Sequence, residues 1–444
     1  MQQAKNLRIF QIIFVVSLCL EIIFQIFGRK IFGIYLNPIL WILAGFMICF
    51  TAFKLIGFRP SFDKVSTSSN IQWWQKILFV FAFVGLAYWC GNFMNKIFHK
   101  IPIDPATSDI LPTIQTYIQR LLSGEVVYRP IPYEGYEVGA TYLPLLWSPY
   151  LFSEWLNIDY RWTAYLIFLI PLFLYQYRLL NQSMSWGELG FKMLIPFLWL
   201  YLFTQFEAKM LGMSVELLPI GFYLLLTLSI FHRKTWVVAL GILLCLMSRY
   251  AFTFWLPVYL LTYLIERGFF KTFKVGLIIL VGVISIYIVP FLSKDWTIFT
   301  NGLKYYERTA VDQWKAQDWQ ASDEIPYHLQ RGLSTAIYFY NFQADTQSSK
   351  ERLDVNRKAH LFACAFAAFL LLLGYVVYRK RGLNPKIYFL IGLKFYLTFF
   401  YGFFYVPFSY LFQLPLFLSI AILYHIPFTK TRQLKESNTN SSLE

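Results

Sequence analysis

The polar stretch at residues 93–160 carries the charged groups best placed to do chemistry. It contains Asp109 and Arg129 and then runs into a segment around Tyr142. Charge is scarce in the chain as a whole, since Asp, Glu, Lys and Arg make up 14% of the residues and hydrophobic residues 57%. An acidic side chain ahead of an amphipathic segment, between two hydrophobic segments, is therefore the first candidate for a reacting carboxylate.

The environment of Asp109 is open to two interpretations. Apolar residues recur at helical spacing over 107–122, which predicts an amphipathic helix lying on the membrane surface. Ser108 or Asp109 would begin this helix, and Pro112 is tolerated in its first turn. Asp109 is thus either a helix N-cap or a catalytic carboxylate, whereas Asp104, which precedes a proline, is interpreted as a turn residue.

The second candidate is a cation within a hydrophobic run. Residues 235–266 are apolar except for Ser248 and Arg249 near their centre. One helix of this length would extend about 47 Å, beyond the ~30 Å hydrocarbon core, so the run predicts two helices joined at Arg249. An unpaired guanidinium at that depth costs at least ~2.5 kcal/mol, and we expect an anionic partner, Glu207 or Glu216.

The composition indicates an all-α polytopic membrane protein. The mean hydropathy is +0.50, and 46 Phe, 31 Tyr and 14 Trp exceed what the polar residues of a soluble globule could cover. Backbone groups in lipid must be satisfied within the segment, which favours helices. By run length and basic flanks we expect about 12 transmembrane helices, at 9–28, 32–53, 75–92, 161–179, 191–206, 215–231, 235–248, 251–265, 272–291, 359–378, 387–403 and 405–425.

Basic residues predict the orientation of these spans. Those in the short loops fall on one side if the N-terminus is cytoplasmic, and only Arg29 and Lys30 contradict this distribution. Both long loops then face outward. The expected parts are a membrane hairpin at 1–74, a core at 75–291 with its first outer loop at 93–160, a second outer loop at 292–358, the C-terminal transmembrane helices at 359–425, and a disordered cytoplasmic tail at 426–444.

The net charge of +15 does not indicate a nucleic-acid partner. Lys and Arg occur mostly in short clusters that flank hydrophobic segments, where they anchor the chain against anionic lipid. The lipid bilayer is therefore the partner that the composition predicts.

Several short motifs resemble the GT-C glycosyltransferases, integral-membrane enzymes that use polyprenol-phosphate sugars and include the mannosyltransferases. The similarity covers roughly residues 75–300, and it depends on the order and spacing of the motifs. The matching positions are Ser108, Asp109, Gly124, Tyr128 and 141–145 in the first outer loop, then 216–219, Gly241, Ser248, Arg249, Tyr250 and Pro257. The family's first outer loop commonly follows the first span, whereas two additional spans precede it here, so residues 1–74 are interpreted as an addition to the family pattern.

The resemblance implies an inverting transfer from a polyprenol-phosphate sugar to a glycan, lipid or protein acceptor outside the membrane, with Asp109 as general base. Substrate-binding roles would fall to Arg249 at the phosphate, more weakly Lys209, Tyr142 with Arg129 at the entrance, and His328 with Arg331 in the second outer loop. The acidic residue that usually neighbours the catalytic one is missing, so a divalent metal is not supported and no cofactor is expected. The expected location is a bacterial inner membrane, with the active site on its extracytoplasmic side.

Two other classes fit the same features. A flippase or transporter of lipid-linked saccharides would also have about 12 spans and buried charge, although such proteins tend to show internal repeats, and the two halves of this chain do not match. A polymerase or ligase of surface polysaccharide would rely on arginines and a histidine in a late loop. Arg331 and His328 of the second outer loop are compatible with this class. These alternatives remain open at the level of sequence.

Overall fold

The computed structural model describes residues 2–57, 72–133, 136–139, 141–182, 184–315, 325–342, 348–381, 384–426 and 428. All but a few residues of the expected cytoplasmic tail at 426–444 lie outside this part of the chain.

Helices account for nearly all of the regular structure. The elements are α1 (Gln2–Ile26), α2 (Gly28–Gly57), α3 (Trp73–Lys100), α4 (Ile110–Leu122), β1 (Ile131–Tyr133), β2 (Tyr136–Val138), α5 (Pro144–Trp147), η1 (Ser148–Tyr150), α6 (Leu151–Leu156), α7 (Tyr160–Leu180), α8 (Trp186–Phe206), α9 (Ala208–Gly212), α10 (Leu217–Ile230), α11 (Thr235–Leu246), η2 (Tyr250–Phe252), α12 (Trp255–Arg267), α13 (Phe269–Val283), η3 (Ile284–Leu292), α14 (Thr297–Asp312), α15 (Tyr327–Arg331), α16 (Ala336–Asn341), α17 (Ser349–Lys380), α18 (Pro385–Gly402), η4 (Ser409–Phe412) and α19 (Gln413–His425).

Seven segments of the described chain are long and apolar enough to cross a membrane. They are α1, α2, α3, α7, α8, α13 with η3, and α17. The chain is therefore an all-α integral membrane protein. Helices α10, α11, α12, α18 and α19 occupy the other predicted positions, but α11, for example, is about 18 Å long at 1.5 Å per residue, so the count of about 12 spans stays a prediction.

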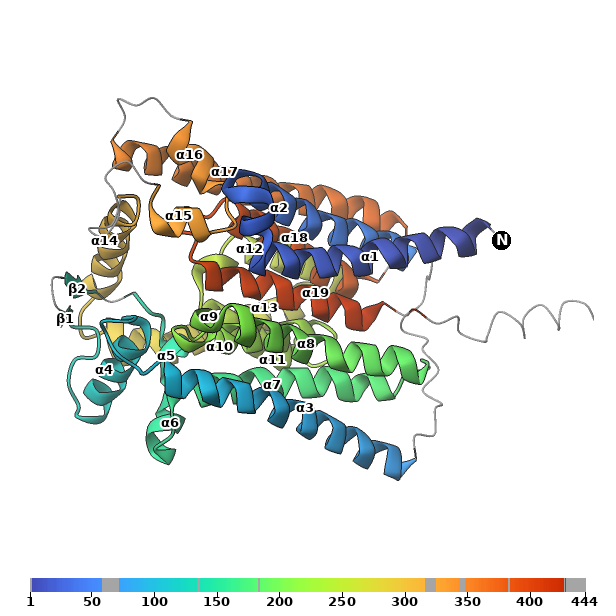
Figure 1. Cartoon of the computed structure of the whole chain (residues 1–444), viewed down its shortest axis with the longest axis horizontal. Helices are drawn as coiled ribbons and strands as arrows, with labels where there is room; N and C mark the ends of the chain where they lie inside the picture. The colour runs from blue at the N-terminus through green and yellow to red at the C-terminus, as the bar shows by residue number, and fades with distance from the viewer. Residues whose placement is uncertain are drawn as a thin grey trace, which may run out of the picture.

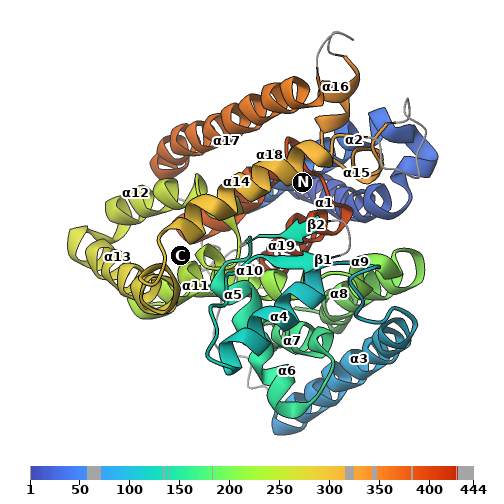
Figure 2. The same cartoon turned by 90° about the vertical axis from the view of Figure 1, so that its left-hand side faces the viewer.

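The two long loops fold at the same end of the helix bundle. Helices α4, α14, α15 and α16 and the β1–β2 hairpin lie together at one end, and the N-terminal end of α1 lies at the other (Figure 1). Seen from the loop end, α14 crosses the bundle beside the hairpin and α4 (Figure 2). We call this group of elements the cap. The hairpin pairs Ile131 with Val138 in antiparallel register, and the sequence patterns did not predict it.

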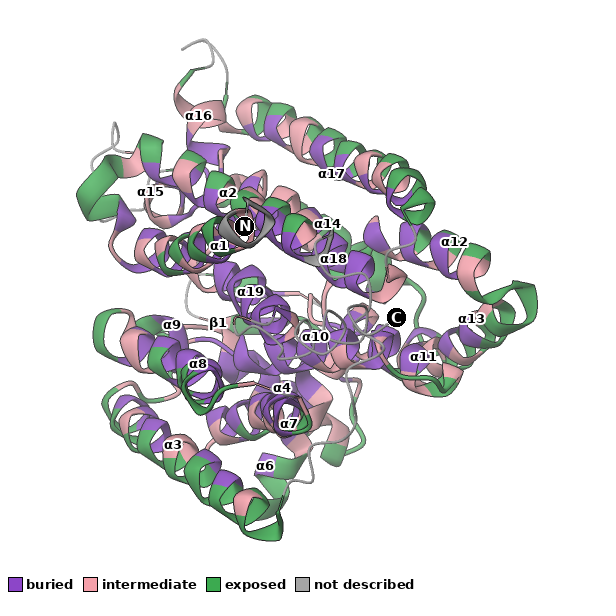
Figure 3. Ribbon diagram, turned by 90° about the vertical axis from the view of Figure 1, so that its right-hand side faces the viewer, coloured by how far each residue is buried: buried purple, intermediate pink, exposed green. Residues whose placement is uncertain are grey.

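A buried ion pair joins the N-terminal hairpin to the last two helices. Glu21 of α1 and Lys394 of α18 have no exposed side-chain surface and form a salt bridge. Ser419 of α19 donates a hydrogen bond to the second carboxylate oxygen of Glu21 over 2.7 Å, and Lys394 donates to the carbonyl of Pro415 over 3.0 Å. Helices α1, α2, α18 and α19 accordingly lie side by side (Figure 3), so the hairpin packs against the bundle through a buried face.

A second polar anchor lies where α7 begins. Arg161 is 3% exposed and donates to the carbonyls of Phe98 and Ile101 at the end of α3 and to that of Gly212 at the end of α9, over 2.6–3.0 Å. Its Nε donates to Asp159 over 2.9 Å. All these contacts serve the termini of helices, where carbonyls lack intrahelical partners. Arg161 therefore holds α3, α7 and α9 together.

We expect Lys394→Met to reduce the free energy of unfolding by about 3–5 kcal/mol, because it leaves the buried Glu21 carboxylate without its cation. Thermal unfolding in detergent would measure the loss. The double variant E21Q/K394M should recover most of it. The control is Lys315→Met, which removes one partner of an exposed pair and should cost less than about 1 kcal/mol; equal losses at both sites would contradict the assignment.

Candidate functional site

Asp109 stands at the N-terminus of α4 without capping it. It is the residue before the helix, but its side chain accepts no capping hydrogen bond. The preceding residue, Ser108, accepts a hydrogen bond at its hydroxyl oxygen from the amide of Ile110 over 3.5 Å. Within the described residues the Asp109 carboxylate forms no salt bridge. It accepts a hydrogen bond from its own backbone amide. Asp109 is therefore the N-cap residue by position, as predicted, but its carboxylate is not occupied by helix capping.

The apolar face of α4 packs on the protein rather than on the membrane. Its residues Leu111, Ile114, Tyr117 and Ile118 are at most 2% exposed, and the helix contacts α5 and η1. The predicted helix is confirmed, and its apolar face is covered by protein rather than left free for lipid; its placement on the membrane surface stays a prediction. Periodicity identifies an apolar face, and here the following loop folds back to cover it.

Burial raises the pKa of the Asp109 carboxyl above its ordinary value, and its own backbone amide opposes this in part. Removal of a carboxylate from water disfavours its charged form. An Asp with a raised pKa is a stronger proton acceptor once it is ionised. Such a perturbed carboxyl in a polar group of residues is a candidate functional residue.

Tyrosine hydroxyls surround Asp109. Its charge interacts electrostatically with five of them, which come from β1, β2, the loop before α5, α14 and η4: Tyr133, Tyr136, Tyr142, Tyr305 and Tyr410. Both outer loops and the segment before α19 therefore contribute to its surroundings.

The predicted break at Arg249 is confirmed. Helix α11 ends at Leu246, Arg249 is extended with φ −147° and ψ 136°, and η2 follows before α12 begins. The first outer loop is fixed to this break by a main-chain hydrogen bond, in which the amide of Leu145 donates to the carbonyl of Met247 over 3.0 Å. The segments that carry Tyr142 and Arg249 thus lie side by side.

The anionic partner of Arg249 is Glu216, one of the two predicted carboxylates. The guanidinium forms a salt bridge with Oε1 of Glu216, and the side chains are 20% and 2% exposed, respectively. In the part of the chain that is described, Oε2 of Glu216 and Nε of Arg249 have no hydrogen-bond partner. Buried polar atoms are rarely left in this state, so the pair retains capacity to bind a further group.

Arg249 also interacts electrostatically with five tyrosines: Tyr142, Tyr150, Tyr306, Tyr401 and Tyr410. Tyr142 and Tyr410 interact electrostatically with both Arg249 and Asp109. The two charged groups therefore border the same region of the protein. We call the eight tyrosines around Asp109 and Arg249 the tyrosine cluster. Tyr150 and Tyr401 are at most 1% exposed, and their hydroxyls have no partner among the described residues.

Tyr142 is held in this region by its neighbours. The hydroxyl of Tyr128 donates to the Tyr142 carbonyl over 3.0 Å, and the indole of Trp147 donates to the Tyr128 hydroxyl over 3.0 Å. Burial raises the pKa of Tyr142 well above its ordinary value. The phenol is therefore neutral at pH 7 and available as a hydrogen-bond donor.

His328 and Arg331 occupy one turn of helix, α15, as their spacing predicted. The guanidinium of Arg331 lies 3.8 Å from the carboxylate of Glu207. Burial, and then the charge of Arg331, lower the pKa of His328 to about 4, so the ring is neutral at pH 7. It packs edge-on against Phe408, with ring centroids 4.8 Å apart, next to the segment that carries Tyr410.

Lys209 and Arg129 are not brought into the site. Both side chains are exposed, Lys209 on α9 and Arg129 before β1, and neither forms a salt bridge with another described residue. The carbonyl of Arg129 accepts a hydrogen bond from Arg120, which shapes the loop without involving the Arg129 guanidinium. Their predicted contacts with substrate remain predictions.

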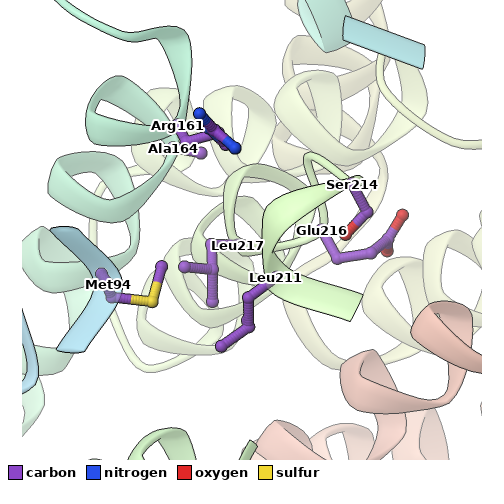
Figure 4. A pocket seen from close by; sticks show the side chains of 7 residues that line it. All are labelled: Met94, Arg161, Ala164, Leu211, Ser214, Glu216 and Leu217. Carbon is purple, nitrogen blue, oxygen red and sulfur yellow. The ribbon is translucent and has the colours of Figure 1, made fainter. Parts of the chain in front are cut away.

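A small cavity of about 10 Å³ lies on the far side of Glu216, lined by Met94, Arg161, Ala164, Leu211, Ser214, Glu216 and Leu217. This volume holds about one water molecule. In Figure 4 the Glu216 carboxylate points away from Met94 and Leu217. The cavity is too small for a sugar, and it belongs to the packing between α3, α7 and α9.

Sequence reasoning did not find most of the tyrosine cluster. Tyr150, Tyr306, Tyr401 and Tyr410 come from four distant segments, and 31 tyrosines in the chain give no signal for these four. Glu216 was recognised only as a structural partner of Arg249. No group of three or more His, Cys, Asp or Glu residues suited to a metal ion occurs among the described residues.

The fold and the site define an all-α integral membrane protein with a polar, tyrosine-rich site where the cap meets the helix bundle. Comparisons with protein families, with curated proteins and with solved structures find no match for this chain.

Asp109→Asn should raise the thermal unfolding temperature at pH 7. The folded-state pKa of this carboxyl is raised, so its contribution to stability is present in acid and is lost as the pH rises through that pKa. At neutral pH the fold carries an ionised, partly buried carboxylate, which the amide removes. The difference between variant and wild type should therefore grow from pH 4 to pH 7; a difference that shrinks over this range would contradict the assignment.

Arg249→Met should reduce the free energy of unfolding by about 3–5 kcal/mol, because it leaves the buried Glu216 carboxylate unpaired. The double variant R249M/E216M, measured by the same thermal unfolding, should recover most of this loss. Any function that needs the guanidinium would stay lost in the double variant. Recovery of both stability and function would show that the pair is purely structural.

Proposed function

We propose that this protein is a membrane glycosyltransferase of the GT-C type, which moves one sugar from a polyprenol-phosphate donor to an extracytoplasmic acceptor. The observation that carries the proposal is the common surroundings of Asp109 and Arg249. Among the described residues, a carboxylate without a salt bridge and a guanidinium with an uncommitted Nε border one group of tyrosines. Such a transfer requires a base for the acceptor hydroxyl and a ligand for the donor phosphate.

In the proposed reaction Asp109 accepts the proton of the acceptor hydroxyl. The acceptor oxygen forms a bond to the anomeric carbon as the bond from that carbon to the phosphate oxygen breaks, and the electron pair leaves with the phosphate. One displacement inverts the anomeric centre. A single carboxylate suffices, because the departing phosphate is already a good leaving group and needs no proton.

Arg249 would bind the donor phosphate while it keeps its salt bridge to Glu216. The guanidinium has five N–H donors, and Nε is among those not used by Glu216. Because Glu216 offsets part of the positive charge, further donors are needed. The unpartnered hydroxyls of Tyr150 and Tyr401 are suited to supply them, since neutral phenols donate hydrogen bonds to phosphate oxygens without adding charge.

The remaining assignments follow from this reaction. Tyr142 interacts electrostatically with both base and cation, and it would orient the sugar. His328 and Arg331 would border the site from the second loop. The acceptor is a glycan, lipid or protein, the location is a bacterial inner membrane, and the cap then faces the extracytoplasmic side, as the distribution of basic residues predicts.

The decisive variant is Asp109→Asn, with Asp104→Asn as its control in the same loop. Asp104 accepts from the amide of Ala106 over 3.0 Å in a turn, so its loss removes a carboxylate without touching the site. Purified proteins would be given synthetic polyprenyl-phosphate sugars and a bacterial envelope extract as acceptor, and release of free polyprenyl phosphate would be measured. We expect a roughly hundred- to ten-thousandfold loss for Asp109→Asn and little change for Asp104→Asn.

Full turnover by a folded Asp109→Asn variant would show that Asp109 is not the base. Movement of the donor across proteoliposomes without any transfer would instead favour the flippase. Extension of an existing saccharide chain by repeating units would favour the polymerase or ligase.

A further inference from the structure

Arg29 and Lys30 are the basic residues that contradict the charge distribution of the remaining short loops. They lie in the first turn of α2, which begins at the cap end of the bundle (Figure 1). Gly33 has a φ of 74°, which breaks the helical path of α2, so residues 28–32 form a turn that is separate from the membrane-spanning helix. Glycine suits this position because a positive φ is costly for other residues.

The turn is attached to the second outer loop of the cap. Arg29 Nη2 donates to the side-chain oxygen of Gln330 in α15 over 3.0 Å. Two further hydrogen bonds join Tyr35 of α2 to Tyr338 and Asn341 of α16. The position of Arg29 and Lys30 is therefore fixed by contacts from α15 and α16.

Three cations converge here on one carboxylate. Glu207, between α8 and α9, lies 3.8 Å from Arg331 and also interacts electrostatically with Lys30 and Arg29. Arg29, Lys30 and Arg331 are positively charged and Glu207 is negatively charged. We call these four residues the basic cluster, and its net charge is +2. Arg29 and Lys30 are exposed, and neither forms a salt bridge within the described residues. The cluster therefore has unused capacity for an anion.

The surface beside the basic cluster is apolar. Ile31 is 61% exposed, Leu36 47% and Phe206 55%, and Phe27 packs against Phe206 with ring centroids 4.8 Å apart. In a membrane protein, such side chains at the ends of spanning helices face the acyl chains of the lipid. We expect cationic groups at the end of such a surface to lie at the depth of lipid phosphates.

We propose that the basic cluster binds the phosphate of an anionic phospholipid in the leaflet on the cap side. The guanidinium of Arg29 and the ammonium of Lys30 would hold the phosphate, with Arg331 shared between it and Glu207, while the acyl chains pack along Ile31 and Leu36. Binding of one monoanionic lipid lowers the local charge from +2 to +1. This proposal does not rest on the transferase chemistry, because it uses neither Asp109 nor Arg249, although Arg331 belongs both to the basic cluster and to the border of the proposed transferase site.

The test compares R29Q/K30Q with R233Q/K234Q in the full-length protein. Arg233 and Lys234 form an equally exposed basic pair between α10 and α11, so the control variant loses the same charge elsewhere. Each protein would be reconstituted in phosphatidylcholine nanodiscs with and without phosphatidylglycerol. Retained phosphatidylglycerol would be measured by native mass spectrometry, and lipid-dependent stabilisation by thermal unfolding.

We expect wild type and R233Q/K234Q to retain phosphatidylglycerol and R29Q/K30Q to retain it roughly tenfold less. Glu207→Gln should retain more phosphatidylglycerol than wild type, because it removes the carboxylate that competes for the cations. This variant tests the site while Arg29, Lys30 and Arg331 are all still present. Equal losses in the two double variants would overturn the proposal in favour of diffuse charge attraction, as would absence of retention by wild type. Retention of undecaprenyl phosphate in place of phosphatidylglycerol, again lost in R29Q/K30Q, would overturn the phospholipid assignment and give the cluster to the donor.

Discussion

The pairing of charge inside an apolar bundle is the constraint on which this structure depends. A carboxylate or ammonium removed from water without a partner is costly, and these buried charges accordingly occur as pairs: Glu21 with Lys394, Glu188 with Lys192 within α8, and Glu216 with Arg249. The first and last pairs join segments far apart in the sequence. Pairing therefore determines which helices are neighbours, in addition to the non-directional packing of aromatic and aliphatic side chains.

Asp109 differs from these paired carboxylates, and this difference gives it functional interest. It is partly buried, its pKa is raised, and no cation offsets it among the described residues. Such an arrangement has a free-energy cost that packing alone does not explain. Proteins tolerate this kind of cost at sites where a reactive group must remain available. The nearby tyrosines provide polar contact without neutralising the charge.

Features that depend on local sequence could be predicted. The helix after Asp109 follows from periodicity, and the break at Arg249 follows from a hydrophobic run too long for one crossing. The need for an anionic partner follows from the depth of Arg249. Features that depend on tertiary packing could not be predicted: the burial of the apolar face of α4, the helix-end contacts of Arg161 and the convergence of the tyrosines. Strands of three residues, as in the β1–β2 hairpin, are too short to give a periodic signal.

The bond between the amide of Leu145 and the carbonyl of Met247 connects two main-chain atoms. Its formation is therefore independent of the identity of either side chain, apart from proline at position 145, which lacks the amide hydrogen. The alignment of the first loop with the α11–α12 break can thus persist while both residues diverge in evolution. Distant homologues could preserve the spatial relation between Asp109 and Arg249 with little detectable similarity at these positions.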